Sequence, residues 1–321
     1  MTLDEHSILG LRNVPPTLQG GVLTIGNFDG VHLGHQRILG RCRELADELG
    51  APVAAMTFEP PPDLVLRPQD VPQRLTPPEP KAQLLVEAGA DRVVFVTADD
   101  ALLGQTPGEF LDAVILRRFA PRHIVEGRDF CFGCRRQGNL ATLRDAGRHA
   151  GFEVHTVDPV TLELDGRPQR VSSSLTRGLI SAGRVEDAAR CLGRPFTLYG
   201  RVVAGAGQGR LLRFPTANLE VDGQIVPADG VYAGRAAVGQ RVHPAAISIG
   251  NKPTFGPSPR TIEAFLLDVS ADAANRELNL YDQRLALGFV RRLRDQERFD
   301  GLDALRAQIE RDVQRVREIC G

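Results

Sequence analysis

Two histidines three residues apart, His32 and His35, follow an apolar run and a glycine-containing turn, where a helix is expected to begin. Residues at this spacing share one face of a helix. The first turn of a helix also offers N–H groups and the positive end of the dipole, which favour anions. Gly30 and Gly34 let a ligand approach the backbone, and two imidazoles there can stabilise charge at an attacked phosphorus. The stretch predicts a phosphate site, with Asp29 beside it to position a metal ion or an imidazole.

A simpler interpretation of the two histidines is that they only cap the helix. The surrounding residues match neither the P-loop pattern nor the G-x-G-x-x-G dinucleotide fingerprint. A second candidate for phosphate binding is "SSSLTR", Ser172 to Arg177, where hydroxyls at a helix start are followed by a guanidinium. Such a group would bind the phosphates from the opposite side, although helix capping by serine explains the same residues.

The second half of the chain contains a glycine-rich stretch, "GAGQGRLLRFPTANLEV", from Gly205 to Val221. In a strand, Thr216 and Asn218 would point to one face. Both side chains offer oxygen atoms, which Mg²⁺ prefers, and the glycines before them can fold over phosphates. The alternative is an ordinary β-turn that contains an asparagine.

Glu263 lies in the apolar run "TIEAFLLD". A carboxylate between Ile262 and Ala264 is costly to bury unless it is paired or functional. It is therefore a candidate general base for a hydroxyl group. The alternative is a glutamate that faces outward in an alternating strand.

The elements that would position the first group alternate between strands and helices. We expect strands at "VLTIG", "PVAAMTF", "DRVVFVT", "HIVEG" and "FEVHTV". Helices are expected over His35–Leu49 and Lys81–Ala88, from "TPGEF" through Arg118, and over "NLATLRDAGRHA". Continuous apolar strands separated by helices indicate a parallel sheet covered on both faces, which binds ligands at the carboxyl ends of its strands.

The pattern changes after residue 172. Two helices are expected between Ser172 and Gly193, followed by short glycine-rich strands that indicate an antiparallel barrel or sandwich. A last amphipathic helix, about Leu302 to Ile319, should pack on the barrel. The sequence thus predicts a Rossmann-like α/β domain over residues 1–190, and a β-barrel domain with a C-terminal helix over residues 191–321.

The bulk composition excludes several classes of function. The 321 residues carry a net charge of −1, so no overall field attracts nucleic acid or a membrane. No run is apolar enough to span a bilayer, which favours a cytoplasmic protein. The five cysteines form no disulfide framework, and "CFGC" is interpreted as a loop with two thiols. Only two lysines occur, which argues against a lysine-centred mechanism.

The first half resembles the HxGH nucleotidyltransferases through "GNFDGVHLGH". The stretches "TFEPPP", "VEGRDFCFG" and "SSSLTR…LGRPF" make it similar to the N-terminal module of the bacterial bifunctional riboflavin kinase/FAD synthetase family. The resemblance implies attack of an FMN phosphate oxygen on the α-phosphorus of ATP, which gives FAD and pyrophosphate with Mg²⁺ present, and it implies that Asp129 binds the flavin. The residues implied to contact ATP are Gly26, Asn27, Phe28, Asp29, His32, Gly34, His35, Ser172, Ser173 and Arg177.

The second half resembles the riboflavin kinase domain of the same family through "FPTAN", "SIGNKPTFG", "TIEAFLLD" and "ERFDGLDALRAQIERD". The resemblance implies that Thr216 and Asn218 hold Mg·ATP, and that Glu263 activates the riboflavin 5′-hydroxyl for attack on the γ-phosphate. The nucleotide-binding glycine loop would include Gly207, Gly209 and Arg210. Five residues depart from the family pattern: Pro61, Cys131, Cys134, Arg213 and Phe265.

The leading hypothesis is a bifunctional transferase that makes FMN from riboflavin and ATP, then FAD from FMN and ATP. The departures motivate a competing hypothesis, an FMN adenylyltransferase with an impaired kinase domain. Two further hypotheses are a non-catalytic flavin-binding protein and a nucleotidyltransferase that acts on another phosphate ester. We expect a monomer or a weak homo-oligomer with no nucleic-acid or membrane partner.

Overall fold

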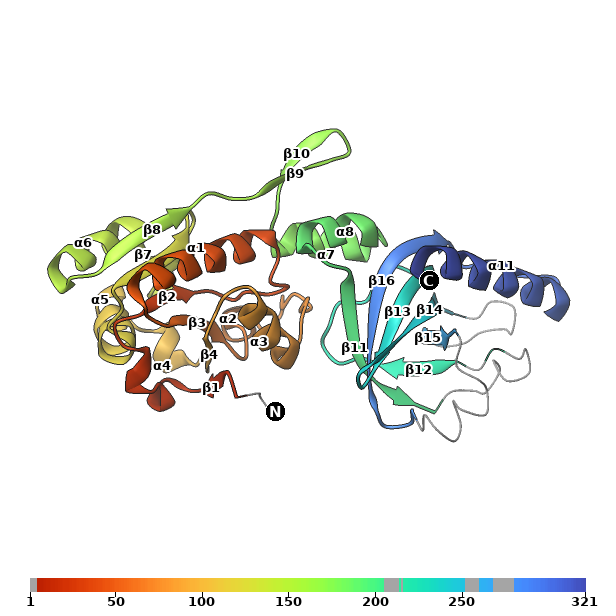
Figure 1. Ribbon diagram of the computed structural model, residues 1–321, viewed down its shortest axis with the longest axis horizontal. Helices are drawn as coiled ribbons and strands as arrows, with labels where there is room; N and C mark the ends of the chain where they lie inside the picture. Colours follow the sequence, from red (N-terminus) through yellow and green to blue (C-terminus); the bar gives the residue numbers. More distant parts are fainter. Residues whose placement is uncertain (1–4, 205–213, 215, 252–259, 268–279) are drawn as a thin grey trace. The chain divides into compact units, whose positions relative to one another are not determined.

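The computed structural model describes residues 5–204, 214, 216–251, 260–267 and 280–321 (Figure 1). The chain divides into two compact units, Met1–Ser172 and Ser173–Gly321. This division falls 18 residues before the boundary expected after residue 190. The two helices that follow residue 172 are therefore grouped with the second unit.

A parallel sheet of six strands forms the centre of the first unit, in the order β1-β4-β3-β2-β5-β8. Its strands are β1 (Ser7–Leu9), β2 (Val22–Ile25), β3 (Val53–Phe58), β4 (Arg92–Val96), β5 (His123–Gly127) and β8 (Glu153–Val157). The five strands expected from the sequence are confirmed. The sixth, β1, is a three-residue edge strand, too short to show a pattern.

Helices cover both faces of this sheet, as predicted. They are α1 (Leu33–Leu49), α2 (Pro62–Leu66), α3 (Pro78–Glu87), α4 (Asp100–Leu103), α5 (Pro107–Phe110), a π-helix (Leu111–Phe119) and α6 (Leu140–Ala150). One apolar layer packs α1 and α3 against side chains such as Val53 and Val125. The other packs Phe110, Phe119 and Leu143 against the opposite face.

The strand order creates a switch point beside β2. Strands β3 and β4 follow on one side of β2, and the chain then crosses to the other side to form β5 and β8. In open α/β sheets, ligands bind outside the carboxyl ends of the strands where the order reverses. Here those ends are Ile25 of β2 and Gly127 of β5, so the histidine turn and the residues after β5 lie beside the expected crevice.

The first unit also carries two small strand pairs. Strands β6 (Cys131–Phe132) and β7 (Gly138–Asn139) pair with each other, as do β9 (Thr161–Leu164) and β10 (Arg167–Arg170). Both thiols of "CFGC" are free: Cys131 lies on β6, and Cys134 opens a short 3₁₀ helix, Cys134–Arg136.

The second unit is a closed antiparallel barrel, which decides between the barrel and the sandwich expected from the sequence. The order is β11-β12-β15-β14-β13-β16, and β16 pairs with β11 to close it. The strands are β11 (Phe196–Val203), β12 (Ala217–Glu220), β13 (Gly230–Val238), β14 (Arg241–Gly250), β15 (Thr261–Leu266) and β16 (Arg284–Arg294).

Among its described residues, the barrel unit includes the helices α7 (Ser173–Ser181), α8 (Val185–Leu192) and α11 (Leu302–Cys320). The predicted packing of the last helix is confirmed, because Val313 and Val316 lie in one apolar cluster with Val231 of β13 (Figure 1). The first residue of the expected stripe, Leu302, is exposed. A buried ion pair between Asp312 of α11 and Arg294 of β16 also fastens the helix.

Among the residues that the structure describes, no helix is both long enough and apolar enough to cross a membrane.

Candidate active sites

The turn between β2 and α1 has a backbone shape that sequence patterns do not predict. Phe28, Gly30 and Val31 all have positive φ angles, of 47°, 83° and 40°. Only glycine adopts such angles without strain, so the surrounding packing must hold the other two residues. The ring of Phe28 is buried and meets the ring of His35 edge-on, with centroids 5.2 Å apart. The turn is thus built around Phe28, and it fixes the orientation of the second histidine.

The two histidines of this turn stack on each other at the start of α1. Their ring centroids are 3.6 Å apart, with 21° between the ring planes. His32 is the N-cap residue, and its Nδ1 accepts a hydrogen bond from the backbone N–H of Gly34 at 3.1 Å. A Cβ on Gly34 would lie 3.0 Å from the His32 ring, so glycine leaves the room that the cap needs. The capping interpretation therefore holds for His32, alongside any role with a ligand.

The cap changes which groups face a phosphate. The N–H of Gly34 already donates a hydrogen bond to His32. The N–H of His35 also has a partner, because it donates to the carbonyl oxygen of His32 at 2.8 Å. Two of the backbone N–H groups expected to bind an anion are thus occupied, and the imidazoles become the main candidates. Nδ1 of His35 is buried and has no hydrogen-bond partner among the described residues. Burial lowers the pKa of His35, as do the nearby His32 and Lys81, so the ring is neutral near pH 7.

The other residues of the turn hold neighbouring segments. The carboxylate of Asp29 accepts hydrogen bonds from the backbone N–H groups of Leu75 and Thr76, at 2.9 to 3.2 Å. Asp29 therefore anchors the loop that contains Leu75 and Thr76. The sequence predicted a role for Asp29 beside a metal ion or an imidazole, and it did not predict this contact. The side chain of Asn27 is exposed. A Cβ on Gly26 would lie 3.1 Å from the Phe28 ring, so a larger residue here would require that ring to shift.

Lys81 is a residue of this site that the sequence reasoning dismissed. Its side chain is only 6% exposed, and its Nζ lies 3.5 Å from the carbonyl oxygen of Asn27 and 3.4 Å from that of Phe58. Burial lowers its pKa to about 8, against the opposing effect of Glu59. The signal in the sequence is a lysine on the buried side of α3, one turn before Leu85.

Glu126 is a second residue that was not singled out, and it lies at the switch point itself. It is 3% exposed, and its Oε1 accepts a hydrogen bond of 2.7 Å from the backbone N–H of Ile25, across from β5 to β2. The ladder between these strands pairs only Val22 and Leu23 of β2. Burial raises the pKa of Glu126 well above its usual value, which favours the protonated carboxyl group. Its signal in the sequence is a glutamate inside the apolar strand "HIVEG".

The remaining predicted residues of the first site lie on other elements. Asp129 is exposed and forms an ion pair with Arg170 of β10. Ser173 and Arg177 are four residues apart on α7, so they share a helix face, and both are half-buried. Ser172 ends the first unit, whereas α7 belongs to the second. The closure of these three residues over the phosphates stays a prediction.

Strand register brings together two predicted residues of the kinase site. Asn218 of β12 is directly opposite Glu263 of β15, and Ser248 of β14 is opposite Glu263 on the other side. Side chains at directly opposite positions lie on one face, with Cβ atoms about 5 Å apart. Glu263 is half-buried on the outer face of the barrel, while Ile262 and Ala264 are buried. The apolar neighbours that suggested a buried carboxylate therefore point away from it.

The oxygen donors beside Glu263 fit a magnesium ion. Asn218 offers an amide oxygen and Thr216, half-buried directly before β12, offers a hydroxyl. Phe265, two residues after Glu263, meets Phe214 edge-on at 5.2 Å. The predicted glycine-loop residues Gly207, Gly209 and Arg210, together with the departure at Arg213, lie outside the described residues.

Comparison with known proteins matches a family model to each half of the chain. Residues 14–175 match the FAD synthetase model, and residues 192–320 match the riboflavin kinase model. The protein named bifunctional riboflavin kinase/FMN adenylyltransferase in Pseudomonas fluorescens is 39% identical over 314 residues, covering 98% of this chain and 97% of that protein. The protein of that name in Escherichia coli K12 is 34% identical over 316 residues, covering 98% and 97%.

The chain belongs to the bifunctional riboflavin kinase/FMN adenylyltransferase family. The family predicted from the sequence is thereby confirmed, as is the class of enzyme, a transferase with one domain for each step. The fold is confirmed as well. A crystal structure described as a macrolide-efflux protein from Streptococcus pneumoniae has a TM-score of 0.84 and 27% identity, and the match covers 97% of this chain and 99% of that one.

The family models also bear on the helices between the two domains. The FAD synthetase match ends at residue 175 and the riboflavin kinase match begins at residue 192. Most of α7 and all of α8 lie between these matches, although both helices are grouped with the barrel. In this bifunctional family member, the functional boundary after residue 190 stays a prediction.

Proposed function

We propose that this chain phosphorylates riboflavin to FMN in its barrel unit and adenylylates FMN to FAD in its sheet unit, with ATP as the second substrate of both reactions. The observation that supports it best is that each compact unit contains the candidate catalytic side chains for one of the steps. Stacked imidazoles stand at the switch point of the sheet. A carboxylate stands beside oxygen donors on the barrel.

For adenylylation, the proposed reaction is the attack of an FMN phosphate oxygen on the α-phosphorus of ATP. The bond to the β-phosphate breaks, and pyrophosphate leaves with the electron pair. His32 and His35 would bind the phosphates and stabilise, through hydrogen bonds, the charge that develops at phosphorus. Lys81 is buried near the turn. Its positive charge would attract the phosphates, and this attraction is stronger in a site from which water is excluded. We further propose that Ser172, Ser173 and Arg177 bind the phosphates.

For phosphorylation, Glu263 would accept the proton of the riboflavin 5′-hydroxyl as its oxygen attacks the γ-phosphorus of ATP, and ADP leaves. Thr216 and Asn218 would hold a magnesium ion, which neutralises phosphate charge when it is bound. The strand pairing that puts Asn218 opposite Glu263 supports this arrangement, because it brings a proposed metal ligand and a proposed base to neighbouring positions on one face of the sheet.

The test is a product assay with two parallel arms. Purified protein and Mg·ATP are incubated with riboflavin in one arm and with FMN in the other, and FMN and FAD are separated by chromatography. We expect FMN and FAD from riboflavin, and FAD from FMN. Absence of both products from both arms would refute the proposal.

Two substitutions assign the steps to the units. His32→Asn keeps a good N-cap but removes the imidazole, so FAD formation should fall about 10²- to 10³-fold with the kinase step unchanged. His149→Asn, at an exposed position of α6, is the matched control. Glu263→Ala should reduce FMN formation about 10²- to 10⁴-fold while FMN is still converted to FAD. Glu220→Ala on neighbouring β12 is its control.

A second candidate function is FMN adenylylation alone. Phe265 favours it, because an aromatic side chain packed on Phe214 stands two residues from the proposed base, where the family often has histidine. The same assay separates the candidates, since FAD from FMN without FMN from riboflavin means an inactive kinase.

The main proposal also includes a cytoplasmic location, a monomer or weak homo-oligomer, and flavin binding through Asp129. It includes no nucleic-acid or membrane partner.

A further inference from the structure

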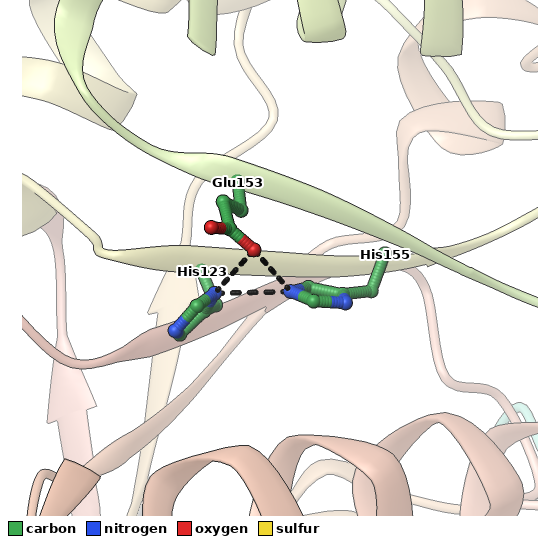
Figure 2. Close-up of side chains that lie close together, drawn as sticks. All are labelled: His123, Glu153 and His155. Atoms are coloured by element: carbon green, nitrogen blue, oxygen red, sulfur yellow. Dashed lines mark hydrogen bonds and ion pairs between the residues drawn. The ribbon is translucent and has the colours of Figure 1, made fainter.

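A second histidine pair lies at the opposite, amino end of the sheet. His123 and Glu153 are the first residues of β5 and β8, and they are register partners. His155 is two residues further along β8, so all three side chains lie on one face (Figure 2). It is the face covered by α1, because Val125 and Val157 belong to the apolar layer under that helix.

The three side chains direct one atom each to a common point. Nε2 of His155 is 3.0 Å from Nδ1 of His123. A single carboxylate oxygen of Glu153 is 3.8 Å from Nδ1 of His123 and 3.7 Å from Nε2 of His155. The oxygen is thus nearly equidistant from the two nitrogens, and Figure 2 shows the resulting triangle.

These separations match a metal site. A tetrahedral ion with bonds of about 2.0 to 2.1 Å holds its ligand atoms roughly 3.3 Å from one another. The observed separations of 3.0, 3.7 and 3.8 Å lie around that value. Hydrogen bonding explains only the shortest side, because 3.7 and 3.8 Å exceed hydrogen-bond distances. The two longer sides are ion-pair contacts between the carboxylate and each imidazole. One ion shared by the three atoms accounts for all three separations.

We propose that His123, Glu153 and His155 bind a divalent transition-metal ion, with Zn²⁺ as the best fit. Two imidazoles and a carboxylate form a common zinc set, whereas Mg²⁺ takes oxygen ligands. The histidine side chains are 16% and 23% exposed, and that of Glu153 is 74% exposed. The imidazoles thus provide a largely buried half of the site, and the fourth position opens to water on the side of the carboxylate.

The charges around the site are balanced in favour of a cation. The carboxylates of Glu153 and Glu48 and the guanidinium group of Arg41 all act electrostatically on His155. The positive charge of Arg41 opposes a cation, but Arg41 is paired with Glu44 at 2.8 Å. The bound ion would fasten the edge strand β8 to β5 and thereby stabilise the first unit.

The first test is binding by the full-length protein after treatment with a chelator. Isothermal titration with Zn²⁺ should show one ion per chain, and a large excess of Mg²⁺ should not displace it. Glu153→Gln preserves an exposed side chain and should weaken binding by more than about tenfold, as should His155→Ala. His149→Ala on α6 is the matched control and should bind like the unmodified protein.

Cobalt as a probe identifies the ligands, because free thiols such as Cys131 also bind zinc. Co²⁺ should give visible absorption bands typical of tetrahedral coordination without a thiolate charge-transfer band. Those bands should disappear in His155→Ala. Absence of zinc binding, a thiolate spectrum, or equal affinity in the Glu153→Gln and His155→Ala variants and the unmodified protein would overturn the proposal. In that case the two imidazoles share one hydrogen bond and nothing more.

A stability measurement gives an independent readout. Zn²⁺ that binds only the folded state should raise the Tm of the unmodified protein and of His149→Ala, and the rise should grow with zinc concentration. Glu153→Gln should show a smaller rise at the same zinc concentration. Equal rises in Glu153→Gln and the unmodified protein would count against this site.

Discussion

The sheet unit carries two histidine pairs at opposite ends of the same sheet, and their neighbours are of opposite charge. At the carboxyl end, His32 and His35 stack ring on ring, with the ammonium group of Lys81 close enough to lower the pKa of His35. At the amino end, His123 and His155 bring their nitrogen atoms together beside the carboxylate of Glu153.

The difference shows that neighbouring residues decide what a histidine pair binds. A pair next to a cation suits an anionic ligand, and stacked rings present their edges along one side. A pair next to an anion, with converging nitrogens, suits a cation. Sequence spacing does not indicate what each pair binds, and it does not reveal the second pair at all, because His123 and His155 are 32 residues apart on two strands.

The largest expected effect is a double dissociation between the pairs. His35→Ala should lower FAD formation from FMN about 10²- to 10³-fold, because it removes a group aimed at developing charge, yet leave zinc binding intact. His155→Ala should do the reverse. Adenylylation rates and zinc titrations on both variants provide the measurement. If either variant lost both properties, the two ends of the sheet would not be independent.

The next effect tests the cation beside the first pair. Lys81→Met keeps the side-chain volume but removes the charge, so kcat/KM for adenylylation should fall about 10- to 100-fold, less than for a group that contacts the phosphate. Because Lys81 lowers the pKa of His35, that pKa should rise in the variant. The acid limb of the pH–rate profile should then move to higher pH.

The pH profile separates the electrostatic role of Lys81 from a structural one. A purely structural lysine would change the rate or the stability without moving the limb. The kinase step of the same variant serves as the internal control, since it depends on the other unit and should keep its rate.

A smaller effect concerns the space that the first pair needs. Gly34→Ala places a Cβ 3.0 Å from the His32 ring and should displace it, reducing adenylylation about tenfold. Gly40→Ala in the same helix has no atom within 4 Å of the new Cβ. It should instead raise the free energy of unfolding by about 0.5 to 1 kcal/mol without changing the rate. Equal effects of the two substitutions on the rate would contradict the stacked arrangement.

The smallest effect is a change in the pH dependence of stability. The pKa of Glu126 is raised, so above the ordinary value of about 4.3 the folded state keeps a proton that the unfolded chain releases. Stability therefore falls as pH rises through this range. Glu126→Gln has no carboxyl group to titrate and so lacks this loss of stability. The difference in Tm between the variant and the unmodified protein should therefore favour the variant more at pH 8 than at pH 4. Thermal unfolding at both pH values is the measurement.

Much of the fold follows from the sequence, because strong local patterns and packing agree there. Continuous apolar strands and capped helices predict the parallel sheet, and a capping box between Thr106 and Glu109 opens the helix predicted at "TPGEF". The three-residue edge strand β1 was missed because it is too short to show periodicity. The compact units divide after Ser172, because α7 and α8 are grouped with the barrel, while the functional boundary after residue 190 stays a prediction.

The candidate sites were predictable in their motifs but less so in their surroundings. The spacing of His32 and His35 indicated a phosphate site, yet no sequence rule indicates that Lys81, 46 residues further on, is buried near them. Asn218 and Glu263 are 45 residues apart in sequence, and their pairing depends on the register between two strands. Such long-range contacts depend on tertiary structure, which a motif does not encode.

That register makes the barrel sensitive to one kind of sequence change. Side chains alternate between the two faces of a strand, so inserting a single residue ahead of Asn218 within β12 would turn it toward the barrel interior. Two inserted residues would restore the face but displace the amide along the strand. In the family to which this chain belongs, length variation should therefore accumulate in the loops around β12 and β15, and these two strands should keep their length.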